Sequence, residues 1–443
     1  MNHFEAAPSG GPSAGSARSV ISITLVCFAV SMIDGFDTLM LSFVAPLLAK
    51  SLQIDHASLG RVFGAGFVGT VLGSLIIGPL ADRFGRRKML VLALVVTGVF
   101  TLACAFASSA GALAVLRFLG GLGMGGAIPP IAAITAESAS SERRSSLVIL
   151  MFIGFPLGAV IGGAITAALM MKFGWPFVFL MGGSCALAAI VPVLLVIPAA
   201  TPAEATIKTE SQTSEGFIGN VLGRFVGNLF AEGRFAATLA LWFGVLASMI
   251  LSGFLVSFMP TILNLNGVAP DRAALGAVVL NVGAIAGALL ISLIVRRGAP
   301  FVAVAAAFVS GAVMVFTLGR VIGAGNAAFG LLFLVGACIV GAQLTFPAIA
   351  SCLFPTGVRA AGVGWTLAIG RTGSIIGPVV GGVLLAQNWP LSRLFLAAAM
   401  LALCAALGIT LANRWRPRGD GRVRGKPFAK FAITGSEVSD GKH

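Results

Sequence analysis

Twelve stretches of about 20 or more mostly apolar residues follow one another along this chain of 443 residues. A helix needs about 20 apolar residues to cross roughly 30 Å of hydrocarbon at 1.5 Å per residue. Charged residues make up only 10% of the chain, against about a quarter in soluble domains. The sequence therefore predicts an all-α polytopic membrane protein with twelve transmembrane helices.

The expected spans form two groups of six, 20–199 and 235–412, each of which we expect to fold as a six-helix bundle. A polar tail precedes the first group at 1–19, a polar linker separates the groups at 200–234, and a basic tail follows at 413–443. The individual spans are expected at 20–49, 57–81, 88–107, 110–137, 145–170, 176–199, 235–263, 272–295, 299–319, 327–353, 360–386 and 391–412.

The distribution of basic residues predicts the orientation of the spans. Loops rich in Lys and Arg stay on the cytoplasmic side, and an even number of spans places both termini on one side. With cytoplasmic termini, the inner segments hold 21 of the 29 Lys and Arg residues and the outer loops hold six. The other two, Arg117 and Arg371, lie inside spans. We therefore expect a multi-pass inner-membrane protein with both termini in the cytoplasm.

The polar segments outside the spans predict contact with lipid. In the linker, GFIGNVLGRFVGNLFAEGRF (216–235) sets apolar side chains on one helical face and polar ones on another, which predicts an amphipathic helix on the cytoplasmic membrane surface. The tail from Arg414 to Lys442 carries eight basic and three acidic residues, enough to contact anionic head groups. The net charge of +14 is spread over inner loops and tail, so we expect no nucleic-acid partner.

Histidine and cysteine positions argue against an enzyme. The three histidines are His3, His56 and His443, in a terminus, a loop and a terminus. The six cysteines all fall within spans and show no paired or metal-ligand spacing. We therefore expect no metal centre, no cofactor and no catalytic residues.

An internal repeat relates the two groups of spans. PPIAAITAESASSERRSSL around Pro130 and FPAIASCLFPTGVRAAGV around Pro347 each contain a helix end, a short loop with arginine and the start of the next span. Their offset of 217 residues is about half the chain. A duplicated six-helix unit is typical of a transporter whose halves rock around a central site.

Several motifs resemble those of a known family. GPLADRFGRRKML (78–90) resembles the loop signature of the major facilitator superfamily, and RFLGGLGMGGAIPPIAAITAES (117–138) resembles its fourth-helix pattern. DGFDT (34–38), together with VRAAGVGWTLAIGRTGSIIGP (358–378), resembles the aromatic acid:proton symporter family within it. This resemblance implies a carrier that imports hydroxybenzoates, benzoate, protocatechuate or related carboxylates with protons, and we expect it to be a monomer.

Two features depart from the superfamily patterns. The second copy of the loop signature, ISLIVRRGAP (291–300), lacks its acidic residue, so we expect a weaker gate in the C-terminal half. In the fifth span Ala159 stands where an antiporter-type glycine pattern has proline, which counts against drug efflux.

Two aspartates stand inside the first span. Asp34 and Asp37 are three residues apart, hence about 60° apart around a helix and roughly 4.5 Å apart along it, so they share one face. Charges at membrane depth are costly and usually functional. Arg117 lies at a similar depth in the fourth span, and we expect it to pair with Asp34. Since a nearby arginine changes the proton affinity of a carboxylate, these three residues are our proton-coupling candidates. Alternatively, the pair only neutralises itself and locks helices together.

Arg371 is the candidate anchor for a substrate carboxylate. It lies about eleven residues, or about 16 Å, into its span, near the midplane where such transporters hold substrate. A guanidinium can bind a carboxylate through two charge-assisted hydrogen bonds. The alternative is that Arg371 pairs with Asp37 or with helix-end carbonyls.

Other substrate contacts are expected from amide and aromatic side chains in the spans. Gln343 and Asn281 could each bind a ring hydroxyl, or instead join neighbouring helices. The chain has no tyrosine, so an aromatic ring would be held by phenylalanine or tryptophan. Phe36 and Trp365, with Trp242, are the candidates, and the alternative is that these rings only pack.

Charged residues at the inner helix ends are expected to form a cytoplasmic network that holds the outward-facing state. These gating candidates are Asp82, Arg86, Glu137, Arg143 and Arg144. Topological retention of positive charge is the alternative, although it does not account for the two acids.

Other functions of the same fold would carry features of their own. A sugar or polyol symporter would show proline–glutamate signatures after the sixth and twelfth spans, and VIPAATPAEAT (196–206) and RWRPRGDG (414–421) do not supply them. A membrane sensor would need an added signalling domain. Transport of another organic anion and export in place of import stay open.

Overall fold

The structure is a computed structural model that describes residues 14–140, 143–199, 233–295, 299–323, 325–355 and 358–416. Within these ranges it contains twelve helical spans long and apolar enough to cross a membrane. The predicted fold class is confirmed, and the span boundaries differ from the expected ones by a few residues in most cases. The predicted amphipathic helix over 216–235 and most of the basic tail lie outside the described residues.

The N-terminal half contains six spans. The sixth is interrupted at Ala189 because Pro192 has no N–H to donate to the carbonyl of Ala188. The first begins earlier than expected, and its helix continues past the predicted end at residue 49. The helices are α1 (Ala14–Leu52), α2 (His56–Phe84), α3 (Arg86–Cys104), α4 (Ala110–Ser138), α5 (Arg144–Phe173), α6 (Trp175–Ala188) and α7 (Ile190–Val196).

The C-terminal half also contains six spans, and its fourth is the most irregular. This tenth span of the chain passes through one turn of π-helix and is then interrupted before Phe346, where Pro347 cannot donate to Gln343. The helices are α10 (Phe235–Leu265), α11 (Pro270–Val295), α12 (Pro300–Val321), α13 (Asn326–Val335), the π-helix η1 (Gly336–Val340), α14 (Gly341–Gln343), α15 (Phe346–Leu353), α16 (Arg359–Ala386) and α17 (Leu391–Trp415).

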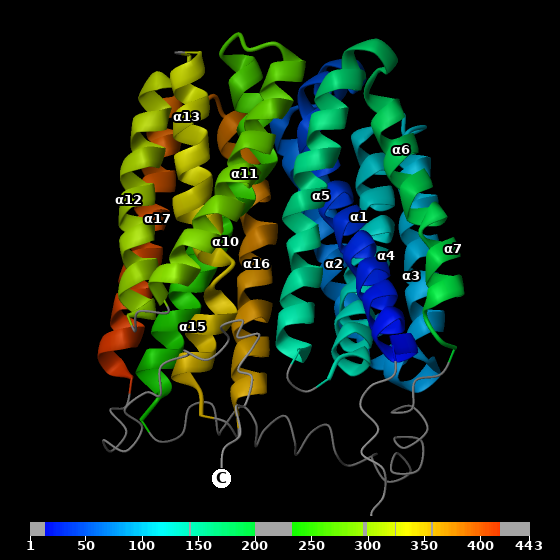
Figure 1. Ribbon diagram of the computed structural model, residues 1–443. Coiled ribbons are helices and arrows are strands. Elements are labelled where there is room, and N and C mark those ends of the chain that lie inside the picture. Colours follow the sequence, from blue (N-terminus) through cyan, green and yellow to red (C-terminus); the bar gives the residue numbers. More distant parts are fainter. Residues whose placement is uncertain are drawn as a thin grey trace, which may run out of the picture.

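Glycines let helices of one bundle approach closely. A Cβ at Gly158 of α5 would overlap the backbone of Met32 in α1, and one at Gly125 of α4 would overlap the backbone of Thr70 in α2. The glycines of the fifth span therefore pack α5 against α1. Figure 1 shows the result, with α1–α7 forming one bundle and α10–α17 a second beside it.

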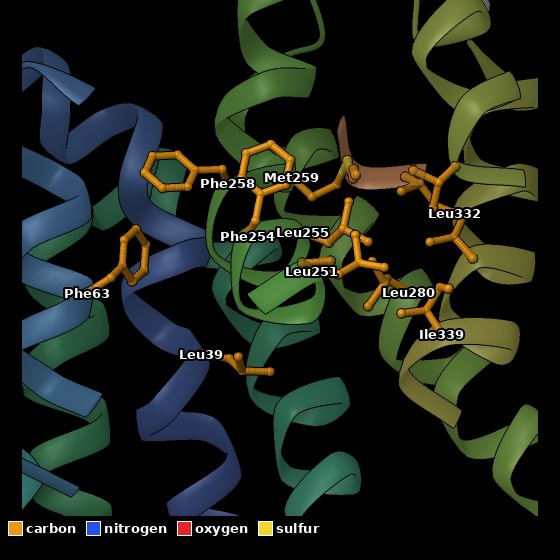
Figure 2. Close-up of a cluster of buried hydrophobic side chains, with 14 of the residues drawn as sticks. Leu39, Phe63, Leu251, Phe254, Leu255, Phe258, Met259, Leu280, Leu332 and Ile339 are labelled. Atoms are coloured by element: carbon orange, nitrogen blue, oxygen red, sulfur yellow. The ribbon is translucent and has the colours of Figure 1, made fainter. Parts of the chain in front are cut away.

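The two bundles meet through helix pairs α2 and α16, α5 and α11, and α1 with α10 and α11. Ser42 of α1 donates a hydrogen bond to the carbonyl of Val256 in α10 at 2.5 Å. The rings of Phe63 in α2 and Phe258 in α10 meet edge to face, with centroids 5.6 Å apart. Figure 2 shows these rings at one edge of an apolar cluster that continues through α10 to Leu332.

The Ser42–Val256 and Phe63–Phe258 contacts lie toward the membrane face opposite Ala14 and Trp415. At the same level, a Cβ on Gly60 of α2 would overlap the backbone of α16 near Pro378 and Gly382. We call this face the closed end and the opposite face the terminal end. In Figure 1 the closed end is at the top.

Candidate functional site

Asp37 and Arg117 form a buried ion pair in the N-terminal half. Nη1 of Arg117 in α4 lies 3.4 Å from Oδ2 of Asp37 in α1, and the two side chains are almost wholly buried. Thr101 of α3 completes the group, because its hydroxyl donates to Asp37 Oδ1 at 2.7 Å and accepts from Arg117 Nη2 at 2.8 Å. Three helices of one bundle are thus joined by one polar cluster.

Arg117 has further partners inside the same bundle. Its Nε lies 3.3 Å from Sγ of Cys104, and its guanidinium lies 5.3 Å from the ring centroid of Phe179 in α6. The sequence motifs did not single out Thr101, Cys104 or Phe179. The three-residue spacing of Thr101 and Cys104, which places both on one face of a helix, was the available signal.

The expected pair of Asp34 and Arg117 is wrong. Arg117 contacts Asp37, one helical turn further along α1. Asp34 is 6% exposed, and its Oδ1 has no hydrogen-bond partner among the described residues. The side-chain charges that act on it are those of Asp37 and of Arg371 in α16. Asp34 is therefore coupled electrostatically to the other half of the molecule.

Arg371 lies at the interface between the halves. Its Nη1 donates a hydrogen bond to Oγ of Ser74 in α2 at 3.0 Å. Asp34 is the charged group that acts on it, and within the described part of the chain Arg371 makes no ion pair shorter than 4 Å. The alternative pairing with Asp37 does not occur here, since Asp37 contacts Arg117. Ser74 was not identified from the sequence.

The two candidate amides make hydrogen bonds within the C-terminal half. Nε2 of Gln343 lies 2.7 Å from the carbonyl of Ser248 and 2.8 Å from the hydroxyls of Ser248 and Ser252, both in α10. Asn281 donates to the carbonyl of Ala277 in its own helix at 2.8 Å. Both side chains are buried. This arrangement favours the alternative that Gln343 joins helices.

The aromatic candidates separate into two groups. Trp365 of α16 and Trp242 of α10 are half-buried, with ring centroids 6.2 Å apart and planes inclined by 32°. Phe36 is buried inside the N-terminal bundle, where it packs against Gly162 of α5 and Gly182 of α6. We therefore remove Phe36 from the substrate candidates, because its ring fills a space left by glycines.

A cavity of about 30 Å³ lies between α1, α2 and α4. Asp37, Arg117, Thr38 and Thr70 form its polar wall. Such a volume fits water rather than an aromatic ring. The cavity is thus part of the Asp37–Arg117 cluster and not a substrate site.

Comparison with known proteins identifies the family. Residues 27–371 match the model of the Major Facilitator Superfamily. The chain belongs to this superfamily.

Relatives within the superfamily transport aromatic acids. The 4-hydroxybenzoate transporter PcaK of Pseudomonas aeruginosa is 32% identical over 88% of this chain and 91% of its own length. The gallate transporter of Pseudomonas putida is 32% identical over 91% of this chain and 93% of its own length. This superfamily member is therefore a multi-pass membrane transporter related to aromatic acid transporters, and the predictions of family and of no enzymatic activity are confirmed.

A solved structure supports the superfamily fold. A bacterial homolog of the human lysosomal transporter Spinster has a TM-score of 0.71 at 16% identity, over 92% of this chain and 98% of that chain. At this identity the similarity concerns the fold alone.

The superfamily loop signature lies at the terminal end. Arg86 of α3 contacts Asp82 of α2 at 3.3 Å and pairs with Glu137 of α4. Arg143 and Arg144, at the start of α5, are exposed. This network joins helices of the N-terminal half.

Proposed function

We propose that this transporter imports a small aromatic carboxylate together with protons by alternating access. The observation that carries the proposal is Arg371, a half-buried cation between the two halves that has no ion pair among the described residues. An unpaired cation at membrane depth favours an anionic ligand. The functions of the two relatives, 4-hydroxybenzoate and gallate transport, support the aromatic class.

Arg371 is the proposed carboxylate anchor. A guanidinium has five N–H donors in a planar fork, and Ser74 accepts one hydrogen bond from Nη1. The remaining N–H groups can donate two hydrogen bonds to a carboxylate. Trp365 and Trp242, whose rings already lie close together on α16 and α10, are the proposed surface for the aromatic ring. Because the N–H groups of Gln343 are directed at Ser248 and Ser252, its amide oxygen is the atom that could accept a hydrogen bond from a ring hydroxyl.

Asp34 is the proposed proton carrier. Its buried Oδ1 lacks a hydrogen-bond partner in the described structure, and a buried carboxylate gains or loses a proton when the charges near it change. Asp37 and Arg117, which are paired with each other and with Thr101, are proposed to set the position of α1 and the field at Asp34. In this proposal they do not carry the proton themselves.

The proposed orientation places the terminal end in the cytoplasm, as the distribution of basic residues indicates. The closed end then faces outward, and the described conformation is closed to the outside. We propose that Arg86, with Asp82 and Glu137, holds the inner ends of its half in place, and that the outward-facing state brings this network, with Arg143 and Arg144, against the other half.

Uptake of labelled 4-hydroxybenzoate by cells that express the protein tests this function. We expect uptake that a protonophore abolishes, that benzoate and protocatechuate inhibit, and that glucose does not affect. Asp34→Asn and Arg371→Lys should each reduce uptake at least tenfold while the protein remains in the membrane. Uptake equal to that of empty cells, with the protein present, would refute the proposal.

A further inference from the structure

Four charged side chains lie deep within the described spans, two acids and two bases. They are Asp34, Asp37, Arg117 and Arg371, and we call them the four-charge set. The other charged side chains of these spans lie within the first or last two turns of their helices. With both aspartates ionised, the four-charge set has no net charge.

The two ion partners of the N-terminal half lie on the same side of the boundary between the halves. Asp37 and Arg117 are buried in the same bundle and share Thr101 as a hydrogen-bond partner. Separating a buried ion pair leaves an uncompensated charge, which is strongly unfavourable. Alternating access moves one half against the other, so this pair crosses no moving boundary and does not need to separate.

Asp34 and Arg371 belong to different halves. Asp34 is on α1, Arg371 is on α16, and each feels the charge of the other. Asp34 has a buried oxygen without a hydrogen-bond partner among the described residues. Arg371 reaches across the boundary to Ser74 of the N-terminal half. These are therefore the two charges whose partners can change when the halves move.

The net charge of the four-charge set decides which states of proton and substrate occupancy can change conformation. With Asp34 ionised, the empty site is neutral. A proton on Asp34 alone gives a net charge of one positive unit, and a monovalent carboxylate on Arg371 alone gives one negative unit. A proton and a carboxylate together restore neutrality. An uncompensated charge in a low-dielectric site is unfavourable, so only the empty and the fully loaded forms change conformation readily.

We infer that the four-charge set makes this transporter an electroneutral symporter that carries one proton with each monovalent carboxylate. The inference rests on the proposed function and specifies its coupling and its substrate charge. Ring hydroxyl groups leave the net charge unchanged, so they are tolerated. A second carboxylate on the ring adds a negative unit that no described residue compensates, so aromatic dicarboxylates are excluded.

The test uses purified protein in liposomes of phosphatidylethanolamine and phosphatidylglycerol, with protein-free liposomes to correct for passive diffusion of the acid. We expect an inside-alkaline pH gradient to drive uptake of 4-hydroxybenzoate. An inside-negative potassium diffusion potential, set with valinomycin, should leave uptake unchanged. Each net charge carried would instead alter the accumulation ratio about 50-fold per 100 mV.

The possible outcomes separate the inference from the proposed function. Uptake driven by the pH gradient but changed by the potential would overturn electroneutral coupling and leave symport standing. No uptake above that of protein-free liposomes would overturn both the electroneutral inference and the proposed function. Uptake of phthalate at a rate similar to that of 4-hydroxybenzoate would contradict the charge rule for substrates.

An Asp34→Asn variant supplies a second measurement. The substitution removes one negative charge from the four-charge set, so the empty site carries one positive charge. A monovalent carboxylate on Arg371 then makes the loaded site neutral without a proton. Exchange of internal for external substrate should therefore continue and no longer depend on pH, whereas net uptake should be lost. Continued exchange also demonstrates that the variant is folded.

Net uptake at the normal rate, or loss of both activities in an Asp34→Asn variant that still binds 4-hydroxybenzoate, would overturn the inference. Asp37→Asn is the matched control, and we expect it to lose both activities.

Discussion

The deep arginines of the two halves differ in where their partners lie. In the N-terminal half, Arg117 has Asp37, Thr101, Cys104 and the ring of Phe179 as partners, all within one bundle. In the C-terminal half, Arg371 faces the opposite bundle and contacts Ser74 there. A charge whose partners lie in its own rigid body stabilises that body, whereas a charge at the boundary is available for a ligand.

The largest expected effect comes from removing the internal charge partner. Arg117→Ala leaves Asp37 buried without a cation, and loss of one partner of a buried pair costs about 3–5 kcal/mol. We expect a large loss of thermal stability in detergent and little protein in the membrane. A variant as stable as the unaltered protein would show that the Asp37–Arg117 pair is not a structural element.

Arg371 should give the opposite pattern. Arg371→Lys keeps the charge but loses the planar fork, and hydrogen bonds to charged groups contribute about 1.5–3 kcal/mol. We expect KM for 4-hydroxybenzoate to rise tenfold or more, with the melting temperature unchanged. The comparison between the halves would fail if Arg371→Lys lowered stability and left KM unaltered.

Gln343 tests whether the C-terminal half also holds internal polar contacts. Gln343→Leu removes the hydrogen bonds to Ser248 and Ser252, each with a net contribution of about 1 kcal/mol. We expect lower thermal stability and an unchanged KM. Gln343→Glu serves as the matched variant, because it keeps the size of the side chain but has no N–H group to donate to Ser248 and Ser252. A raised KM with unaltered stability would instead make Gln343 a substrate ligand.

Thr101 should give the smallest effect of the series. Thr101→Val keeps the shape and removes one hydroxyl that bridges Asp37 and Arg117. The expected loss of stability is about 1–2 kcal/mol, and transport should stay within about threefold of normal. Thermal unfolding followed by fluorescence, together with the uptake assay, measures both quantities.

The sequence was sufficient to predict the spans and to find the deep charges. Apolar runs of membrane length determine the spans, and Asp34, Asp37, Arg117 and Arg371 stand out because their surroundings are apolar. Which aspartate meets Arg117 could not be predicted, since one turn of helix is only about 5 Å and the ends of spans were known to within a few residues.

Hydroxyl and ring partners were also beyond prediction. Ser74 and Thr101 look like the other small hydroxyl residues of the spans, because a hydroxyl can also donate to its own helix, as Thr97 does. The direction of the Phe36 ring depends on two glycines, Gly162 and Gly182, from helices far along the chain. Such contacts follow from tertiary packing, and a local spacing such as that of Thr101 and Cys104 does not identify the partner.

The closed end has a further consequence for the rate of transport. Where Gly60 of α2 meets Gly382 of α16, backbone approaches backbone without side chains between them. Long side chains lose rotamer freedom whenever an interface orders them, whereas glycine has no side-chain freedom to lose. Forming the contact at Gly60 therefore costs little conformational entropy, whereas the neighbouring rings of Phe63 and Phe258 have to be ordered each time the closed end forms.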